Sequence, residues 1–176
     1  LANTFLVAKG YDVGGSLFEL NEVKKAKSLL NKSRKIILPI DLIVADKKTK
    51  KIVRQVYVKN QKQLCSKDEM ILDIGPETVK KYASEIRKAQ TMVWGGPMGL
   101  LEIKTFSHGT IALARIMAAR SSGRAMGIAG GGETLLALDR THMKKYFDFI
   151  STGGSAMLEF LAGKSLPGIM FLVDKC

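Results

Sequence analysis

The chain has 176 residues, of which 46% are hydrophobic and 25% charged, a composition typical of a folded protein and not of a disordered or fibrous one. This length suits one sizeable core, so we expect residues 1–176 to form a single domain. No apolar run approaches the roughly 20 residues that span a bilayer, and the first residues lack the order of a signal peptide, which together predict a cytoplasmic protein without membrane contact.

The formal net charge of +12 is the one unusual feature of the composition. Nucleic acid, an anionic membrane surface or polyanionic small molecules could account for it, and so could a solvated basic surface. Aromatic residues make up only 7% of the chain and do not alternate with the lysines of residues 47–51, as base-stacking platforms would require. The composition therefore favours a solvated surface over a nucleic-acid interface.

Cysteine and histidine are both rare. Cys65 and Cys176 are far apart in the sequence, which predicts reduced thiols and not a disulfide framework. His108 and His142 have no further His or Cys close to them in the sequence. We therefore do not expect a metal held by nitrogen or sulfur.

The first half of the chain predicts two helices, a buried strand, a half-exposed strand and a polar turn, over residues 1–9, 20–32, 35–45, 51–59 and 60–69. Gly10 ends the first helix. The buried strand is apolar at nearly every position, as is typical of a strand covered on both faces. Pro39 indicates a break or an edge position within it.

The second half repeats a strand, a loop and a helix four times. The strands are expected at residues 70–73, 91–94, 125–129 and 147–150, and the helices at 76–89, 108–120, from 133 and at 156–161. Such a repeat is typical of right-handed βαβ units. The sequence therefore predicts an α/β fold of three αβα layers, a Rossmann-like open parallel β-sheet with helices on both faces.

Three of the loops in this repeat are rich in glycine: residues 95–99, 130–132 and 153–154. Loops that follow parallel strands meet at the carboxyl edge of the sheet, where α/β proteins bind ligands. Tight turn geometry would explain one such loop. Three on one edge favour a ligand that the backbone N–H groups approach closely, and a helix N-terminus favours phosphate.

Glu133 and Thr134 follow the second glycine loop. The Thr134 hydroxyl could bind a phosphate oxygen, and the Glu133 carboxylate is the kind of ligand that Mg²⁺ prefers. Glu is also favoured in the first turn of any helix, which is the simpler explanation of Glu133 taken alone. Neither GxxxxGK[ST] nor GxGxxG occurs in the chain. The residues thus predict a phosphate- or nucleotide-binding α/β domain without naming its reaction.

Several longer motifs closely resemble those of the phosphoglycerate kinase family. They are VWGGPMG at residues 93–99, GGGET at 130–134, STGGSAMLE at 151–159, GKSLPG at 163–168, DIGPET at 73–78, LPID at 38–41 and ANTFL at 2–6. The resemblance covers the whole chain in order. It corresponds to the C-terminal, nucleotide-binding half of that enzyme.

The resemblance implies a phosphotransferase of glycolysis with a carboxyl group as acceptor, which moves a phosphoryl group between 1,3-bisphosphoglycerate and ADP. In this family the C-terminal half binds MgADP or MgATP, and the N-terminal half holds the phosphoglycerate. The enzyme is expected to be a monomer. Mg²⁺ with ADP or ATP is therefore the expected cofactor and nucleotide of this chain.

The roles that the resemblance implies fall on ten residues. Glu102 would bind the ribose hydroxyls, and Leu72, Gly96 and Pro97 would line the adenine and ribose slot. Glu133 would take the position of the family's magnesium-linked Asp. The phosphate contacts would come from Gly131, Gly132 and Thr134, and the backbone N–H groups facing the transferring phosphoryl from Gly153 and Gly154.

Three residues depart from the family pattern. Gly95 stands where the family has Asn, Glu133 where it has Asp, and Ser155 where it has a further Gly. The family's N-terminal domain, and a phosphate-binding lysine on the strand before Leu1, are absent from this chain. We expect the isolated chain to bind nucleotide weakly and not to complete the transfer. The alternative is a non-catalytic basic module, binding nucleotide or nucleic acid, whose kinase site has decayed.

Overall fold

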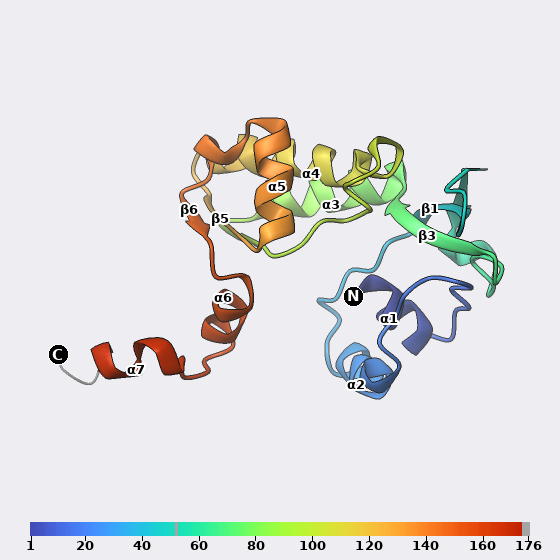
Figure 1. The fold of residues 1–176 in the computed structure, drawn as a ribbon, viewed down its shortest axis with the longest axis horizontal. Helices are drawn as coiled ribbons and strands as arrows, with labels where there is room; N and C mark the ends of the chain where they lie inside the picture. The colour runs from blue at the N-terminus through green and yellow to red at the C-terminus, as the bar shows by residue number, and fades with distance from the viewer. Residues whose placement is uncertain (52, 174–176) are drawn as a thin grey trace. The chain divides into compact units, whose positions relative to one another are not determined.

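The computed structural model describes residues 1–51 and 53–173, so the prediction for Cys176 lies outside the described residues. Its helices and strands, in chain order (Figure 1), are α1 (Ala2–Ala8), α2 (Val23–Lys32), β1 (Asp41–Asp46), β2 (Arg54–Tyr57), β3 (Glu69–Ile74), α3 (Pro76–Lys88), β4 (Thr91–Trp94), α4 (His108–Ser121), β5 (Met126–Gly130), α5 (Gly132–Thr141), β6 (Phe149–Ser151), α6 (Gly154–Leu161) and α7 (Pro167–Val173). The chain divides into two compact units. The first unit comprises Leu1–Tyr82 and Met98–Gly109, and the second Ala83–Pro97 and Thr110–Cys176.

The first unit contains a three-stranded antiparallel sheet in the order β2-β1-β3. In the centre of the sheet, Leu42 pairs with Val56 on one side and Ile74 on the other. Buried apolar residues from β1, β2, α1 and the connecting segments form a core: Leu6, Val13, Leu42, Val44, Val56, Val58, Leu64 and Cys65. Cys65 is a free thiol, as the sequence predicts.

The predicted pairing of one strand is wrong. The sequence predicts residues 70–73 as its first strand, but β3 pairs antiparallel with β1. In the connection from β1 to β2, the Asp46 carboxylate accepts hydrogen bonds from the backbone N–H groups of Lys48 and Thr49, which favours a hairpin of these two strands. The pairing of β3 with β1 joins strands that β2 separates in the chain, and local composition does not specify such a non-local pairing. The buried strand is also shorter than predicted, since it begins at Asp41, after the break that Pro39 indicates.

The second unit contains a parallel sheet in the order β4-β5-β6. Trp94 pairs with Ala129, and Gly130 pairs with Ser151, so the three strands end close to one another. This confirms three of the four predicted strand, loop and helix repeats. Helix α5 packs against β5 (Figure 1). The predicted helix layers on both faces stay a prediction, and α7 was not predicted from the sequence.

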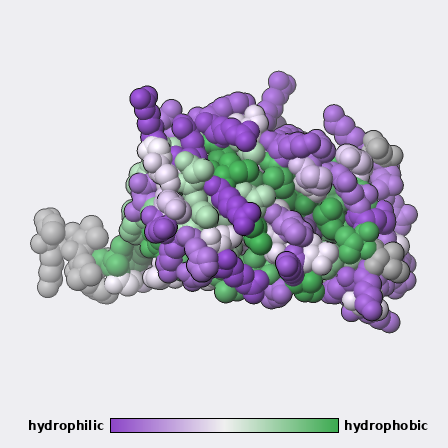
Figure 2. Space-filling model, turned by 90° about the horizontal axis from the view of Figure 1, so that it is seen from above, coloured by the Kyte–Doolittle hydropathy of each residue, from purple (hydrophilic) through white to green (hydrophobic). Residues whose placement is uncertain are grey.

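Charged and polar side chains cover most of the face drawn in Figure 2, with hydrophobic patches between them. Some of the exposed apolar residues lie on the parallel strands, among them Val93, Met126 and Phe149, which are 43%, 48% and 56% exposed. None of the helices formed by the described residues has the length and apolar character needed to cross a membrane.

Candidate functional site

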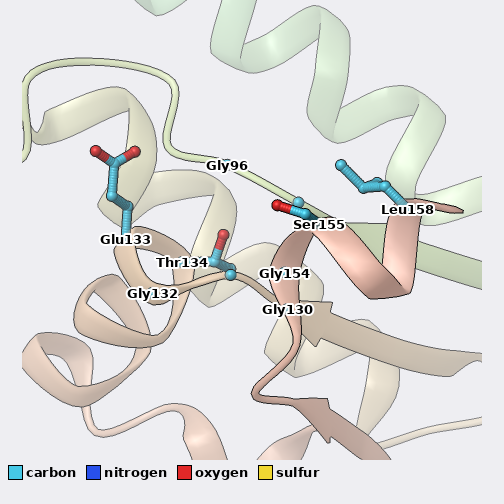
Figure 3. Close-up of a pocket in the computed structure, with 10 residues that line it drawn as sticks. Gly96, Gly130, Gly132, Glu133, Thr134, Gly154, Ser155 and Leu158 are labelled. Carbon is cyan, nitrogen blue, oxygen red and sulfur yellow. The ribbon is translucent and has the colours of Figure 1, made fainter. Parts of the chain in front are cut away.

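A pocket of about 430 Å³ lies in the second unit, where β4, β5 and β6 end (Figure 3). Its lining comes from the loop after β4, the turn and first residues of α5, and the start of α6: Gly95, Gly96, Gly130, Gly131, Gly132, Glu133, Thr134, Gly154, Ser155 and Leu158. Small-molecule sites usually have volumes of about 300–1,000 Å³. The predicted meeting of three glycine loops at one edge of the sheet is therefore confirmed.

A single residue, Gly131, connects β5 to α5. Its φ of 96° lies in the region that favours glycine, and this conformation lets the helix begin directly after the strand. The Gly131 carbonyl accepts the first helical hydrogen bond from the Leu135 N–H at 3.0 Å. No side chain of the described residues caps this end of α5. The first N–H groups of the helix are therefore available to a ligand.

The turn between β6 and α6 closes against the turn between β5 and α5. A Cβ atom added to Gly154 would lie 2.8 Å from the Gly131 Cα atom, so only glycine permits this approach. By contrast, a Cβ atom added to Gly96 or Gly132 would meet no atom of the chain within 4 Å. Packing within the chain therefore does not require glycine at these two positions, which leave open space beside the backbone.

Thr134 is the most unusual polar group of the pocket. Its side chain is 1% exposed, and its Oγ1 atom has no hydrogen-bond partner among the described residues. A buried hydroxyl without a partner costs about 1–3 kcal/mol. Figure 3 shows Glu133 and Thr134 extending from the first turn of α5, with Ser155 and Leu158 on α6. Because protein structures rarely leave such an atom unpaired, this hydroxyl marks a place for an outside partner.

Buried side chains fix the walls of the pocket. The Trp94 indole N–H donates to the Gly96 carbonyl at 2.6 Å, which holds the loop after β4 in place. The Trp94 ring is 4% exposed and lies 6.3 Å from the ring of Phe147. The Met157 thioether packs on Gly130 at the end of β5. The glycine turns are thus supported by a rigid apolar floor.

The structure brings six of the ten predicted site residues to this pocket: Gly96, Gly131, Gly132, Glu133, Thr134 and Gly154. Pro97 and Gly153 are next to lining residues in the chain. Leu72 and Glu102 belong to the first unit, where Leu72 is 4% exposed and packs with Ala45 and Phe106, and Glu102 is exposed. Their assignment to a nucleotide slot stays a prediction.

Four lining residues are not among the ten predicted site residues, although Gly95 and Gly130 belong to the predicted glycine loops: Gly95, Gly130, Ser155 and Leu158. Two of them, Gly95 and Ser155, are departures from the family pattern that stand within the pocket motifs. Leu158 lies four residues after Gly154, on the same side of α6, and is 52% exposed. Helical spacing from the glycine turn would have been the signal that places it at the pocket.

Glu133 is the one carboxylate in the pocket lining. The described residues contain no group of three His, Cys, Asp or Glu side chains that could hold a metal ion by themselves. Mg²⁺, however, commonly binds through one or two carboxylates together with water and substrate phosphates. An exposed Glu133 beside the unpartnered Thr134 hydroxyl fits a Mg²⁺ ion that arrives with a phosphate ligand.

The fold and pocket define an α/β protein whose ligand-sized pocket lies at the carboxyl edge of a parallel sheet. The family model "Phosphoglycerate kinase" matches residues 1–164. The phosphoglycerate kinases of Moorella thermoacetica and Chloroflexus aggregans are 43% and 39% identical to this chain over 99% of its length. The chain therefore belongs to the phosphoglycerate kinase family, and it is homologous to a phosphotransferase.

Solved structures show the same relationship. The structure of phosphoglycerate kinase from Coxiella burnetii has a TM-score of 0.84 and 40% sequence identity over 96% of this chain. The phosphoglycerate kinase from Pyrococcus horikoshii has a TM-score of 0.77 and 31% identity over 94%. This chain spans 44% of the length of the curated relatives it matches, and 43% and 41% of these two structures.

Proposed function

We propose that this chain is the C-terminal, nucleotide-binding half of a phosphoglycerate kinase and that its pocket receives the phosphates of MgADP or MgATP. The family match and the glycine turns support the proposal. The single observation that carries it is the buried, unpartnered Thr134 hydroxyl at the uncapped start of α5. A phosphate oxygen is an acceptor for this hydroxyl and for the free N–H groups of the helix.

Each part of the pocket then has a chemical role. The first N–H groups of α5, at Gly132 and Glu133, and the Thr134 hydroxyl bind the nucleotide phosphates. Glu133 orients Mg²⁺, which neutralises phosphate charge when bound. The N–H groups at Gly153 and Gly154 face the transferring phosphoryl group. Such a transfer depends on in-line positioning and charge neutralisation and needs no covalent bond to the protein.

The proposal also covers the binding of the ribose, the adenine and the second substrate. Glu102 binds the ribose hydroxyls, and Leu72, Gly96 and Pro97 line the adenine and ribose slot. The phosphoryl group passes from the carboxyl oxygen of 1,3-bisphosphoglycerate to the terminal phosphate of ADP. The phosphoglycerate is held by the other half of a monomeric kinase, so the isolated chain binds nucleotide and does not complete the reaction.

Isothermal titration calorimetry with MgADP tests this proposal, on the isolated chain and on the full-length kinase that contains it. We expect both to bind MgADP, and we expect inorganic pyrophosphate to compete because it occupies the same phosphate contacts. Replacing Glu133 by Gln should weaken binding in the presence of Mg²⁺ and have little effect in EDTA. Failure of the full-length protein to bind MgADP would overturn the proposal.

The net charge of +12 favours a second candidate, a non-catalytic basic module that binds nucleic acid. Gly95, Glu133 and Ser155, which depart from the family pattern, are compatible with a decayed kinase site. A steep fall of oligonucleotide affinity with salt concentration would support this candidate. Turnover of 1,3-bisphosphoglycerate by the full-length protein, unchanged by nucleic acid, would exclude it.

A further inference from the structure

A buried carboxylate in the first unit contacts both ends of a chain segment, residues 99–109. Asp73, in β3, is 2% exposed. Its Oδ2 atom accepts a hydrogen bond from the Gly109 N–H at 2.9 Å, and its Oδ1 atom accepts one from the Ile74 N–H at 2.8 Å. A Cβ atom added to either Gly99 or Gly109 would collide with the Asp73 carboxylate. The first and last glycines of residues 99–109 therefore both lie against one side chain.

Residues 99–109 are also anchored between these ends. The Leu100 N–H donates to the Leu72 carbonyl at 2.8 Å, and the side chains of Leu101 and Phe106 are 3% and 0% exposed. The Phe106 N–H donates to the Ile103 carbonyl at 2.9 Å, which closes the turn that follows Glu102. Glu102 is the exposed residue between these buried anchors. Its backbone position is therefore determined by these anchors together with the contacts of Gly99 and Gly109 with Asp73.

We infer that Asp73 is a positioning residue, which fixes the segment 99–109 so that Glu102 is presented to the nucleotide ribose. The inference rests on the proposed function, because Glu102 is a ribose ligand only if the chain binds nucleotide. Asp73 is buried and does not touch the nucleotide itself. It acts through the Gly109 N–H and through the close contacts with Gly99 and Gly109.

Asp41 provides a matched control. It is also a fully buried carboxylate of the first unit, and it also accepts hydrogen bonds at the start of a helix, from the N–H groups of Glu77 and Thr78. The hydrogen bonds that its carboxylate accepts come from Gln55, Glu77 and Thr78, which lie outside residues 99–109. Replacing Asp41 by Asn should therefore lower stability without changing how Glu102 is presented.

The test measures turnover by the full-length kinase with the variants Asp73→Asn, Glu102→Ala and the double variant. We expect Asp73→Asn to raise the KM for MgADP roughly tenfold, as expected when a hydrogen bond to a charged group is lost, with kcat and the KM for 1,3-bisphosphoglycerate changed less than about threefold. If Asp73 acts through Glu102, the double variant should have the same KM for MgADP as Glu102→Ala alone.

The outcomes separate this inference from the proposed function. An effect of Glu102→Ala without an effect of Asp73→Asn overturns the role of Asp73 and leaves the nucleotide site intact. Additive effects, or an equal rise of KM in Asp41→Asn, also overturn it. No effect of Glu102→Ala on MgADP overturns its assignment as a ribose ligand. If Asp73→Asn does not fold, Gly109→Ala tests the same contact from the segment side, because the nearest atoms to its added methyl group belong to the side chains of Asp73 and Ile74, and it should raise the KM for MgADP alone.

Discussion

Helices α3 and α5 begin with nearly the same residues, Pro76-Glu77-Thr78 and Gly132-Glu133-Thr134, yet different groups meet their first turns. At α3, in the first unit, the Asp41 carboxylate accepts the N–H groups of Glu77 and Thr78, at 3.1 and 2.6 Å. The Thr78 hydroxyl donates to the same carboxylate and accepts the Ile40 N–H at 3.0 Å. The chain thus provides its own anion for this helix.

At the start of α5, in the second unit, no described side chain takes the place that Asp41 has at α3. No described side chain caps the helix, and the Thr134 hydroxyl has no partner in the described part of the chain. Both threonines are buried, at 0% and 1% exposure, so solvent does not explain the difference. At the start of α3 the hydrogen bonds are thus completed within the chain, whereas at the start of α5 one buried hydroxyl has no partner among the described residues.

The two threonines should therefore respond in opposite ways to the same substitution. We expect Thr78→Val to lower the free energy of unfolding by about 2–4 kcal/mol, because it leaves the N–H groups of Ile40 and Asp41 without their acceptor and removes one hydrogen bond to the Asp41 carboxylate. Thr134→Val removes a hydroxyl that has no partner, so stability should change by less than about 1 kcal/mol or rise. Urea unfolding measures both. Equal losses of stability in the two variants would contradict the distinction between the two helix starts.

The buried carboxylates of the first unit should also affect how the stability of the protein depends on pH. Burial raises the pKa of Asp73 to about 6 from its ordinary value of 3.8, although the N–H groups of Gly109 and Ile74 and the charge of His108 act in the opposite direction. The folded chain therefore holds this proton more tightly than the unfolded chain. Its contribution to stability is complete below pH 3.8 and is lost as the pH rises through 6.

We expect this group alone to remove up to about 3 kcal/mol of stability across that window, and we expect Asp73→Asn to lack the slope. Glu69, in the same strand, is the control of opposite sign. The hydrogen bond from Arg54 lowers its pKa to about 2, so its contribution is present above pH 4.5 and is lost as the pH falls through 2. Thermal unfolding between pH 2 and 7 measures both. A Glu69→Gln variant that alters the slope near pH 6 would contradict the assignment.

Two glycines of the second unit sharpen the same comparison. Gly154→Ala forces a Cβ atom against Gly131 and should lower stability by about 1–3 kcal/mol. Gly132→Ala meets no atom of the chain, so it should leave stability unchanged or raise it by up to about 1 kcal/mol, because Ala favours the helix. The methyl group that Gly132→Ala adds would meet only a ligand bound in the pocket. Differential scanning calorimetry with and without MgADP should show that Gly132→Ala keeps its Tm and loses the shift produced by nucleotide.

The parts of the site that could be predicted from the sequence are those formed by elements that follow one another directly in the chain. The position of Gly131, Glu133 and Thr134 at the carboxyl edge of the sheet could be predicted because a strand, a glycine turn and a helix follow one another directly in the chain. The antiparallel pairing of β3 was missed because its partner, β1, is separated from it by β2, and composition does not specify such a non-local choice. The hydrogen bond from Gly109 to Asp73 was not predicted for the same reason, since the two residues are 36 positions apart in the chain.

The central claim is that the Thr134 hydroxyl is left unpaired for a nucleotide phosphate. Titration of MgADP into the full-length kinase tests it most directly, comparing wild type, Thr134→Val and the control Thr141→Val, whose hydroxyl bonds the Ala137 carbonyl at the far end of the same helix. We expect Thr134→Val to bind MgADP roughly tenfold more weakly with its Tm unchanged, and Thr141→Val to bind like wild type. Unchanged affinity in Thr134→Val would contradict the account.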